Sequence, residues 1–238
     1  MQLENYVIKN GSGISFTREQ ASHFAKDIAG DFNPLHDADG KLFCVPGDLL
    51  FAIALNHYGL SRHMRFVFSG MVGDETALRL PGGDAAHLVF TDDDGREYLS
   101  IERSGECSRE PDQIRDLTCG YVTFSGKAFP DILVPLMRRH DTMINPGRPL
   151  VIYESMEIDL EHLAFSSPEL RLSDSVFEIN GKKGDIRLGF DVVCNGETVG
   201  RGAKYMLVRG LRPFDEAQMS ALVEQYAGRK ETYAATTL

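Results

Sequence analysis

Residues 49–58 read LLFAIALNHY, with Pro46, Gly47 and Asp48 before them and Gly59 after them. The Pro-Gly-Asp sequence is typical of a helix start, and Gly59 is typical of a helix end. Residues 49–55 are all apolar, so the helix has no polar face over two turns and must be buried on every side. It is too short to cross a membrane. The segment therefore predicts a core helix enclosed by a curved sheet.

Strand-like segments follow this helix at residues 64–69, 76–80, 87–90, 97–102 and 120–125. Glycine- and proline-rich turns separate them, and the DDDG turn at residues 92–95 favours a hairpin. Strands joined by hairpins form antiparallel sheets. The first half therefore predicts an α+β fold with an antiparallel sheet around one helix.

The second half repeats this pattern loosely. A short helix is expected at residues 132–139, and strands are expected at residues 150–158, 170–179, 186–194 and 199–208. We predict two domains, residues 1–128 and 129–238, whose sheets merge side by side. The second domain has the shorter central helix in this interpretation. A terminal helix is expected over residues 213–226, followed by a frayed tail at residues 229–238.

Composition limits the function classes. The chain has 238 residues, 42% of them hydrophobic and 25% charged, which is typical of a globular protein. No apolar run suits a membrane span and no signal peptide is apparent, so we expect a cytoplasmic protein. The net charge of −10 argues against nucleic-acid binding. Four widely spaced cysteines and the absence of a metal-ligand spacing predict neither a metal nor a cofactor.

A second informative stretch, GDFNPLH, spans residues 30–36. It follows a predicted helix whose start is marked by a capping box, Thr17 with Gln20. An Asn-Pro pair forces a bend between Asp31 and His36, which can turn both side chains toward one cavity. A carboxylate and an imidazole in one cavity form a potential acid/base pair. The alternative is a capped turn with an ordinary surface histidine.

The stretch resembles the G-D-x-N-P-[LI]-H signature of MaoC-like, (R)-specific enoyl-CoA hydratases. Residues 66–68 and the turn at residues 73–76 also resemble the strand and the G-D-x-[TS] turn after the central helix of that family. The resemblance implies the hot-dog fold, in which a curved antiparallel sheet wraps around one helix. With its second half, this chain is interpreted as a double hot dog in which only the first half carries the motif.

The resemblance also implies a substrate and a site. The substrate would be an acyl thioester of coenzyme A or of acyl carrier protein. Asp31 and His36 would share the catalytic water and the proton transfers, and Asn33 would order the turn or hydrogen-bond one of them. The backbone amide of Gly47, at the start of the central helix, would donate to the thioester oxygen. Arg62 and Arg65 could bind the phosphates of coenzyme A, although a solvated helix end is the alternative for that cluster.

Three features depart from the family pattern. His36 and Gly47 are only eleven residues apart, whereas the family has about eight more residues there. Pro46 replaces the family's histidine before the glycine, and Ala38 occupies a position that is acidic in the family. Asp48 is unexpected: it is either a first-turn carboxylate favoured by the helix dipole or a thioesterase-like catalytic carboxylate.

Three functions stay open at this point. The first is a hydratase or dehydratase that uses Asp31 and His36. The second is a hot-dog thioesterase in which Asp48 or Asp31 activates water. The third is an acyl-thioester-binding protein without catalysis. The chain would act as a monomer with an internal pseudo-dimer or as a homodimer.

Overall fold

Helix α2 (Gly47–Tyr58) lies at the centre of the computed structural model, which describes residues 1–11 and 13–236. Its residues 48–55 are all buried, as the unbroken apolar run predicts. The centre of the Phe51 ring lies 5.0 Å from the centre of the Phe66 ring on the sheet. It lies 4.7 Å from the centre of the Tyr121 ring on the opposite side. Helix α2 is therefore enclosed between the sheet and a second helix.

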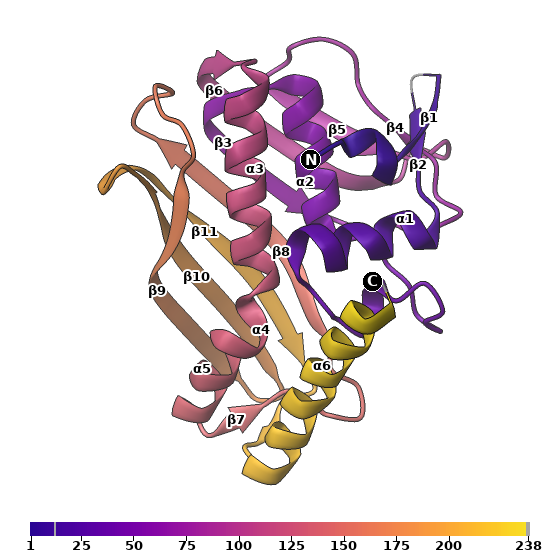
Figure 1. Cartoon of the computed structure of the whole chain (residues 1–238), viewed down its shortest axis with the longest axis vertical. Helices are drawn as coiled ribbons and strands as arrows, with labels where there is room; N and C mark the ends of the chain where they lie inside the picture. Colours follow the sequence, from indigo (N-terminus) through magenta and orange to yellow (C-terminus); the bar gives the residue numbers. More distant parts are fainter. Residues whose placement is uncertain (12, 237–238) are drawn as a thin grey trace.

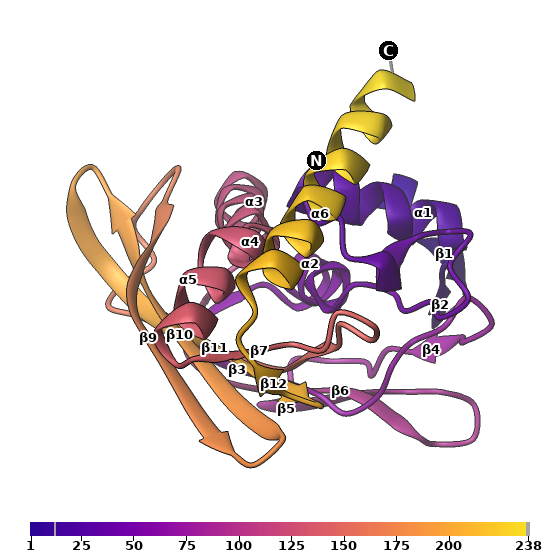
Figure 2. The ribbon, with the colours of Figure 1, turned by 90° about the horizontal axis from the view of Figure 1, so that it is seen from below.

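The sheet beneath α2 is antiparallel and curved (Figures 1 and 2). Across the described residues it has ten strands, in the spatial order β1 (Ile8–Asn10), β2 (Gly13–Ser15), β4 (Leu78–Arg79), β5 (His87–Thr91), β6 (Glu97–Ser108), β3 (Leu60–Phe68), β8 (Val151–Leu160), β11 (Glu197–Arg209), β10 (Lys183–Cys194) and β9 (Glu169–Asn180). A separate short ribbon pairs β7 (Thr142–Met143) with β12 (Arg212–Pro213).

The helices cover one face of this sheet (Figure 2). Besides α2 they are η1 (Leu3–Tyr6), α1 (Arg18–His23), η2 (Phe24–Ala29), η3 (Pro34–His36), α3 (Pro111–Gly126), α4 (Ala128–Asp131), α5 (Leu133–Arg139) and α6 (Glu216–Thr236). A curved antiparallel sheet wrapped around a central helix is the hot-dog fold, so the predicted fold class is confirmed.

The strands of the two halves form one continuous sheet. Strand β3 of the first half pairs with β8 of the second from His63 opposite Asp159 to Val67 opposite Ser155. This pairing gives the side-by-side arrangement expected of a double hot dog. The division of the chain between residues 128 and 129 stays a prediction.

One predicted strand is wrong. Residues 120–125 belong to the long helix α3, which packs against α2 and η2 as well as against β9. The β-rich sequence around Tyr121 and Val122 favours a strand locally. However, the buried positions Ile114, Leu117 and Tyr121 recur with helical spacing once the helix is counted from Pro111. The short helix expected at residues 132–139 is α5 (Leu133–Arg139). It is preceded in the chain by α3, which is longer than α2.

Close packing of α3 depends on a glycine. A Cβ atom on Gly126 would lie 2.0 Å from the carbonyl oxygen of Ala29, at the end of η2. Only glycine lets the two backbones approach this closely. This contact brings the end of α3 next to residues 30–36.

The predicted frayed tail is also wrong up to residue 236. Helix α6 continues through these residues and lies against the N-terminal helices (Figure 1). The Tyr233 hydroxyl donates a hydrogen bond of 2.7 Å to Asp27, and its oxygen lies 2.8 Å from Nδ1 of His23. These polar contacts hold the C-terminal part of α6 against α1 and η2, beyond the apolar part of the helix. In the described part of the chain, no helix combines the length and hydropathy that a membrane crossing requires.

Candidate active site

Residues 30–36 begin where the first helical segment, α1 with η2, ends. Helix α1 has the predicted capping box and widens into the π-helical turn η2, a feature often found at functional sites. Gly30 ends the turn with φ of +66°, and the Asp31 amide donates to the Ala25 carbonyl over 2.8 Å. This left-handed glycine turns the chain so that Asp31 leaves the helix axis.

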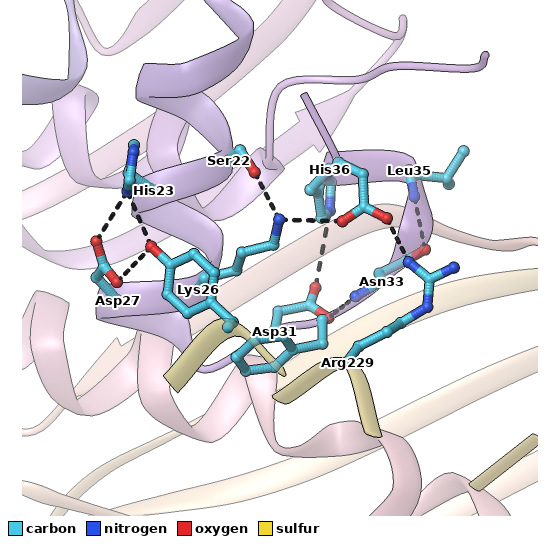
Figure 3. A network of polar contacts seen from close by, with 12 residues as sticks. Ser22, His23, Lys26, Asp27, Asp31, Asn33, Leu35, His36 and Arg229 are labelled. Carbon is cyan, nitrogen blue, oxygen red and sulfur yellow. Dashed lines mark hydrogen bonds and ion pairs between the residues drawn. The ribbon is translucent and has the colours of Figure 1, made fainter. Parts of the chain in front are cut away.

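Asp31 and His36 face each other (Figure 3). Oδ2 of Asp31 lies 3.7 Å from Nε2 of His36, and both side chains are largely buried. This separation exceeds an ordinary hydrogen bond. It is short enough for the two atoms to contact one water molecule or one substrate group between them.

Backbone hydrogen bonds hold both partners in place. Nδ1 of His36 donates to the Cys44 carbonyl over 2.7 Å, because a carbonyl can only accept. In the neutral ring, Nε2 therefore carries the lone pair on the side of Asp31. The Asn33 amide donates to Oδ1 of Asp31 over 2.9 Å, and Oδ1 of Asn33 accepts from the Leu35 amide over 3.1 Å. Asn33 thus contributes two hydrogen bonds within this turn.

Helix α6 covers this turn. The Phe32 amide donates to the Tyr226 hydroxyl over 3.0 Å, and that hydroxyl lies 3.4 Å from Oδ1 of Asp31. Burial, followed by the nearby charge of Asp31, raises the pKa of Tyr226, so its hydroxyl stays protonated and can donate. Arg229 of the same helix pairs with Asp37, which also pairs with Lys26 over 3.1 Å (Figure 3).

The N-terminus of α2 borders the same space. The first amides of an α-helix have no intrahelical partner, and Gly47 and Asp48 are the first two residues of α2. A Cβ atom on Gly47 would lie 3.0 Å from the Tyr153 ring and 3.2 Å from the Phe68 ring. Glycine is therefore the residue that keeps room beside this helix end.

Asp48 belongs to a buried polar chain that includes both halves of the molecule. The Ser125 hydroxyl on α3 donates to Oδ2 of Asp48 over 2.6 Å, and the Lys204 ammonium on β11 donates to the Ser125 hydroxyl. Burial raises the pKa of Asp48, although Lys204 and the Ser125 hydrogen bond oppose the shift. Among the described residues, Oδ1 of Asp48 has no hydrogen-bond partner.

These groups line one cavity of about 300 Å³. Its polar end contains Asp31, His36 and Asp48 with the start of α2, and Ser125 and Lys204 line it as well. The remaining lining is mostly apolar and comes from both halves, with Phe129, Leu133, Ile144, Met206 and Leu222 contributed by the second half. Cys44 also lines the cavity, but burial raises the pKa of its thiol to about 11, so it is a poor nucleophile at neutral pH.

Arg62 and Arg65 are placed elsewhere. Nε of Arg62 donates to the Leu160 carbonyl over 3.0 Å. Arg65 is exposed on β3, in register with Glu102 on one side and Glu157 on the other. Neither arginine is among the described residues that line the cavity. Their binding of coenzyme A phosphates stays a prediction, whereas Arg229 is a cation that does line the cavity.

Sequence reasoning missed Ser125 and Lys204. Ser125 was assigned to the wrongly predicted strand, so its position on a helix beside α2 could not be foreseen. Lys204 had a usable signal: it alternates with Met206 and Val208, the inward positions of a predicted strand. A lysine at a core-facing strand position is rarely accidental.

The family of the chain follows from its sequence. The model of the family described as "Protein of unknown function (DUF3581)" matches residues 1–217. The chain belongs to this family. No sequence among the curated proteins matches it.

Solved structures with a similar fold share little sequence with this DUF3581 member. A conserved protein with a hot-dog fold from Alicyclobacillus acidocaldarius is 9% identical, with 90% of this chain and 99% of that chain covered and a TM-score of 0.48. Acyl-CoA thioesterase II TesB2 from Mycobacterium marinum is 8% identical, with 88% and 98% covered and a TM-score of 0.45. A MaoC-like dehydratase is 12% identical, with 87% and 99% covered and a TM-score of 0.44. Similarity at this level concerns the fold and assigns no reaction.

Proposed function

We propose that this protein is a MaoC-like hydratase or dehydratase that acts on enoyl or 3-hydroxyacyl thioesters of coenzyme A or acyl carrier protein. One observation carries the proposal: the facing pair Asp31 and His36 shares a cavity with the N-terminus of α2. Acid/base groups and a helix N-terminus are the two elements that hydration of a conjugated thioester requires.

The proton transfers follow from the tautomer of His36. With Nδ1 bonded to the Cys44 carbonyl, Nε2 accepts a proton from water as the water oxygen attacks Cβ of the enoyl group. Asp31, 3.7 Å away, positions the same water and relays the proton from Nε2 to Cα, so that both hydrogens of the water end in the product. Asn33 and Tyr226 hold the Asp31 carboxyl in place. Dehydration of a 3-hydroxyacyl thioester runs through the same steps in reverse.

The developing negative charge of the thioester enolate needs donors. Gly47 and Asp48 supply backbone amides at the positive end of the α2 dipole. The missing side chain of Gly47 leaves the thioester oxygen room to approach these amides. The apolar lining beyond them suits an acyl chain.

Thioester hydrolysis is the second candidate, because Asp48 lies in the same cavity with an oxygen that has no partner among the described residues. In that reaction, Asp48 would activate water against the thioester carbonyl. A general base must be ionised. Burial raises the pKa of Asp48, so this carboxyl is ionised less readily than that of an exposed aspartate. This difference favours the hydratase.

The decisive experiment measures both reactions on crotonyl-CoA and longer enoyl-CoA substrates. Loss of the enoyl absorbance reports hydration, and a thiol reagent reports hydrolysis. We expect the parent protein to hydrate these substrates. In Asp31→Asn the hydration rate should fall at least about 100-fold, because general acid–base catalysis contributes about 10²–10⁴-fold. Asp94→Asn, an exposed aspartate in the β5–β6 turn, is the matched control and should leave the rate unchanged.

The other outcomes separate the alternatives. Release of free coenzyme A that Asp48→Asn abolishes and Asp31→Asn spares would assign the thioesterase. Neither signal with any chain length, together with a thermal shift by acyl-CoA, would leave a protein that binds acyl thioesters without catalysis. Full hydration by Asp31→Asn would refute the proposed roles.

A further inference from the structure

Lys204 is a buried cation in the cavity lining that the proposed reaction does not use. The side chain projects inward from β11 and is only 6% exposed. Removing a charged ammonium from water is costly unless an opposite charge or good hydrogen bonds compensate. The position of Lys204 in the cavity lining therefore calls for a partner.

The two groups in direct contact with the ammonium are neutral. It donates to the Ser125 hydroxyl and lies 4.1 Å from the centre of the Tyr153 ring. An ammonium has three donors, so these two contacts leave it capacity for a further acceptor. Asp48 is the carboxyl on the far side of Ser125, and this hydroxyl separates it from Lys204.

The state of Asp48 bears on what Lys204 can attract. Burial raises the pKa of Asp48, so this carboxyl takes up a proton more readily than an exposed aspartate. Among the described residues, no carboxylate forms a direct ion pair with Lys204, because the Ser125 hydroxyl lies between it and Asp48. An anion that enters the cavity would then gain a charge-assisted hydrogen bond.

The position of Lys204 along the cavity defines where such an anion would lie. Through Ser125 it connects to Asp48, which interacts electrostatically with Asp31 and His36 at the polar end. Along β11 it is followed on the same face by Met206, part of the apolar lining. An acyl chain that extends from the polar end into the apolar part would pass Lys204.

We propose that Lys204 recognises a carboxylate on the acyl group, so that the cavity accepts acyl thioesters with a second acidic function. This inference rests on the proposed function, because it assigns the substrate class of the same site. Ser125 and Tyr153 position the ammonium, and both halves of the chain contribute to specificity.

The test compares two ligands that differ at one group. Succinyl-CoA ends in a carboxylate where butyryl-CoA ends in a methyl group, and titration calorimetry gives both affinities. We expect succinyl-CoA to bind about 10- to 100-fold more tightly, as a hydrogen bond to a charged group implies. Lys204→Met should remove this preference and leave the affinity for butyryl-CoA within about threefold. Equal binding of the two ligands by the parent protein would overturn the inference.

Two further variants separate recognition from folding. Lys183→Met removes an exposed lysine from the neighbouring strand β10 and should keep the preference. Ser125→Ala retains the ammonium but removes one of the groups that position it, so the preference should be reduced and not abolished. Loss of the preference in Ser125→Ala to the same extent as in Lys204→Met would assign the effect to packing and overturn the inference. Unchanged butyryl-CoA binding shows that each variant is folded.

A pair of small esters makes the result independent of coenzyme A. Monomethyl succinate and methyl butyrate carry the same two end groups without the nucleotide, and their binding can be followed by NMR titration. Preference for monomethyl succinate that disappears in Lys204→Met supports the carboxylate site even if neither thioester binds, and only the proposed function then fails. Absence of any Lys204-dependent preference in both ligand pairs refutes the carboxylate site.

Discussion

Nδ1 of His36 lies 2.7 Å from the carbonyl oxygen of Cys44, and the Cys44 amide in turn donates to the Leu35 carbonyl over 2.8 Å. These two bonds connect the motif to the short segment that leads into α2. The shortened link between His36 and Gly47 therefore helps to fix the tautomer of the imidazole. A longer loop would need another acceptor for that proton.

His36→Asn should separate this structural bond from the chemistry. The asparagine amide nitrogen occupies the position of Nδ1 and can still donate to Cys44, but it has no counterpart of Nε2. We expect the free energy of unfolding to change by less than about 1 kcal/mol, while hydration falls at least about 100-fold. In His36→Ala the Cys44 carbonyl loses its donor, so the protein should be less stable than His36→Asn by about 1 kcal/mol. Urea denaturation and the enoyl assay measure the two effects, and equal stabilities would contradict the role of this bond.

Tyr226→Phe should weaken both the fold and the reaction. The phenylalanine ring preserves the contacts with Phe32 and Phe129, but the Phe32 amide loses its acceptor, which costs about 1–3 kcal/mol. Asp31 also loses a neighbouring hydroxyl, so hydration should fall. Tyr233→Phe is the comparison, since its hydroxyl bonds to His23 and Asp27. A rate lowered equally by both variants would indicate that α6 acts only through general stability.

Gly47→Ala should impair the reaction much more than the fold. The new methyl group would lie 3.0 Å from the Tyr153 ring and 3.2 Å from the Phe68 ring, beside the amides proposed to bind the thioester oxygen. We expect kcat for hydration to fall at least tenfold, and the free energy of unfolding to fall by about 1 kcal/mol or less, since overpacking offsets the better helix propensity of alanine. Gly228→Ala in α6, where a Cβ atom has nothing within 4 Å, should leave kcat unchanged. An unaltered kcat in Gly47→Ala would exclude Gly47 from the oxyanion site.

Asp48→Asn should change how stability depends on pH. The folded-state pKa of Asp48 is raised above the ordinary value of 3.8, mainly by burial, so the folded chain holds this proton more tightly than the unfolded chain. The resulting stabilisation is complete below pH 3.8 and is lost as the pH rises through the folded-state pKa. The variant has no such loss, so its stability relative to the parent protein should increase with pH above 3.8. Urea denaturation between acid and neutral pH measures the difference, and a difference independent of pH would show that the Asp48 pKa is not raised.

Much of the fold was predictable because local signals and burial agree. Residues 49–55 are all apolar and need burial on every side of a helix, and they form the buried part of α2. Thr17 with Gln20 marks the start of α1, and Gly30 ends the helical segment with a positive φ. Residues 120–125 failed because their β-branched and aromatic side chains suit a strand, whereas their contacts with α2 and η2 determine a helix.

The candidate site was predictable only where its residues are close in the sequence. Asp31, Asn33 and His36 interact through a single turn, so their spacing alone suggests a common function. Ser125 and Lys204 reach Asp48 only through the packing of α3 and β11, which no local pattern encodes. The placement of Arg62 and Arg65 likewise depends on strand pairing with β6 and β8.

The contact between Tyr226 and Asp31 also has a consequence for protein synthesis. The two residues are separated by 195 positions in the chain. At about 5–20 residues per second, the ribosome makes Asp31 roughly 10–40 s before it makes Tyr226. During that interval the nascent chain carries the motif without the helix that covers it, and no early fragment can hold the finished cavity. Synthesis of α6, rather than folding of the first half, is therefore the step after which the cavity can be complete.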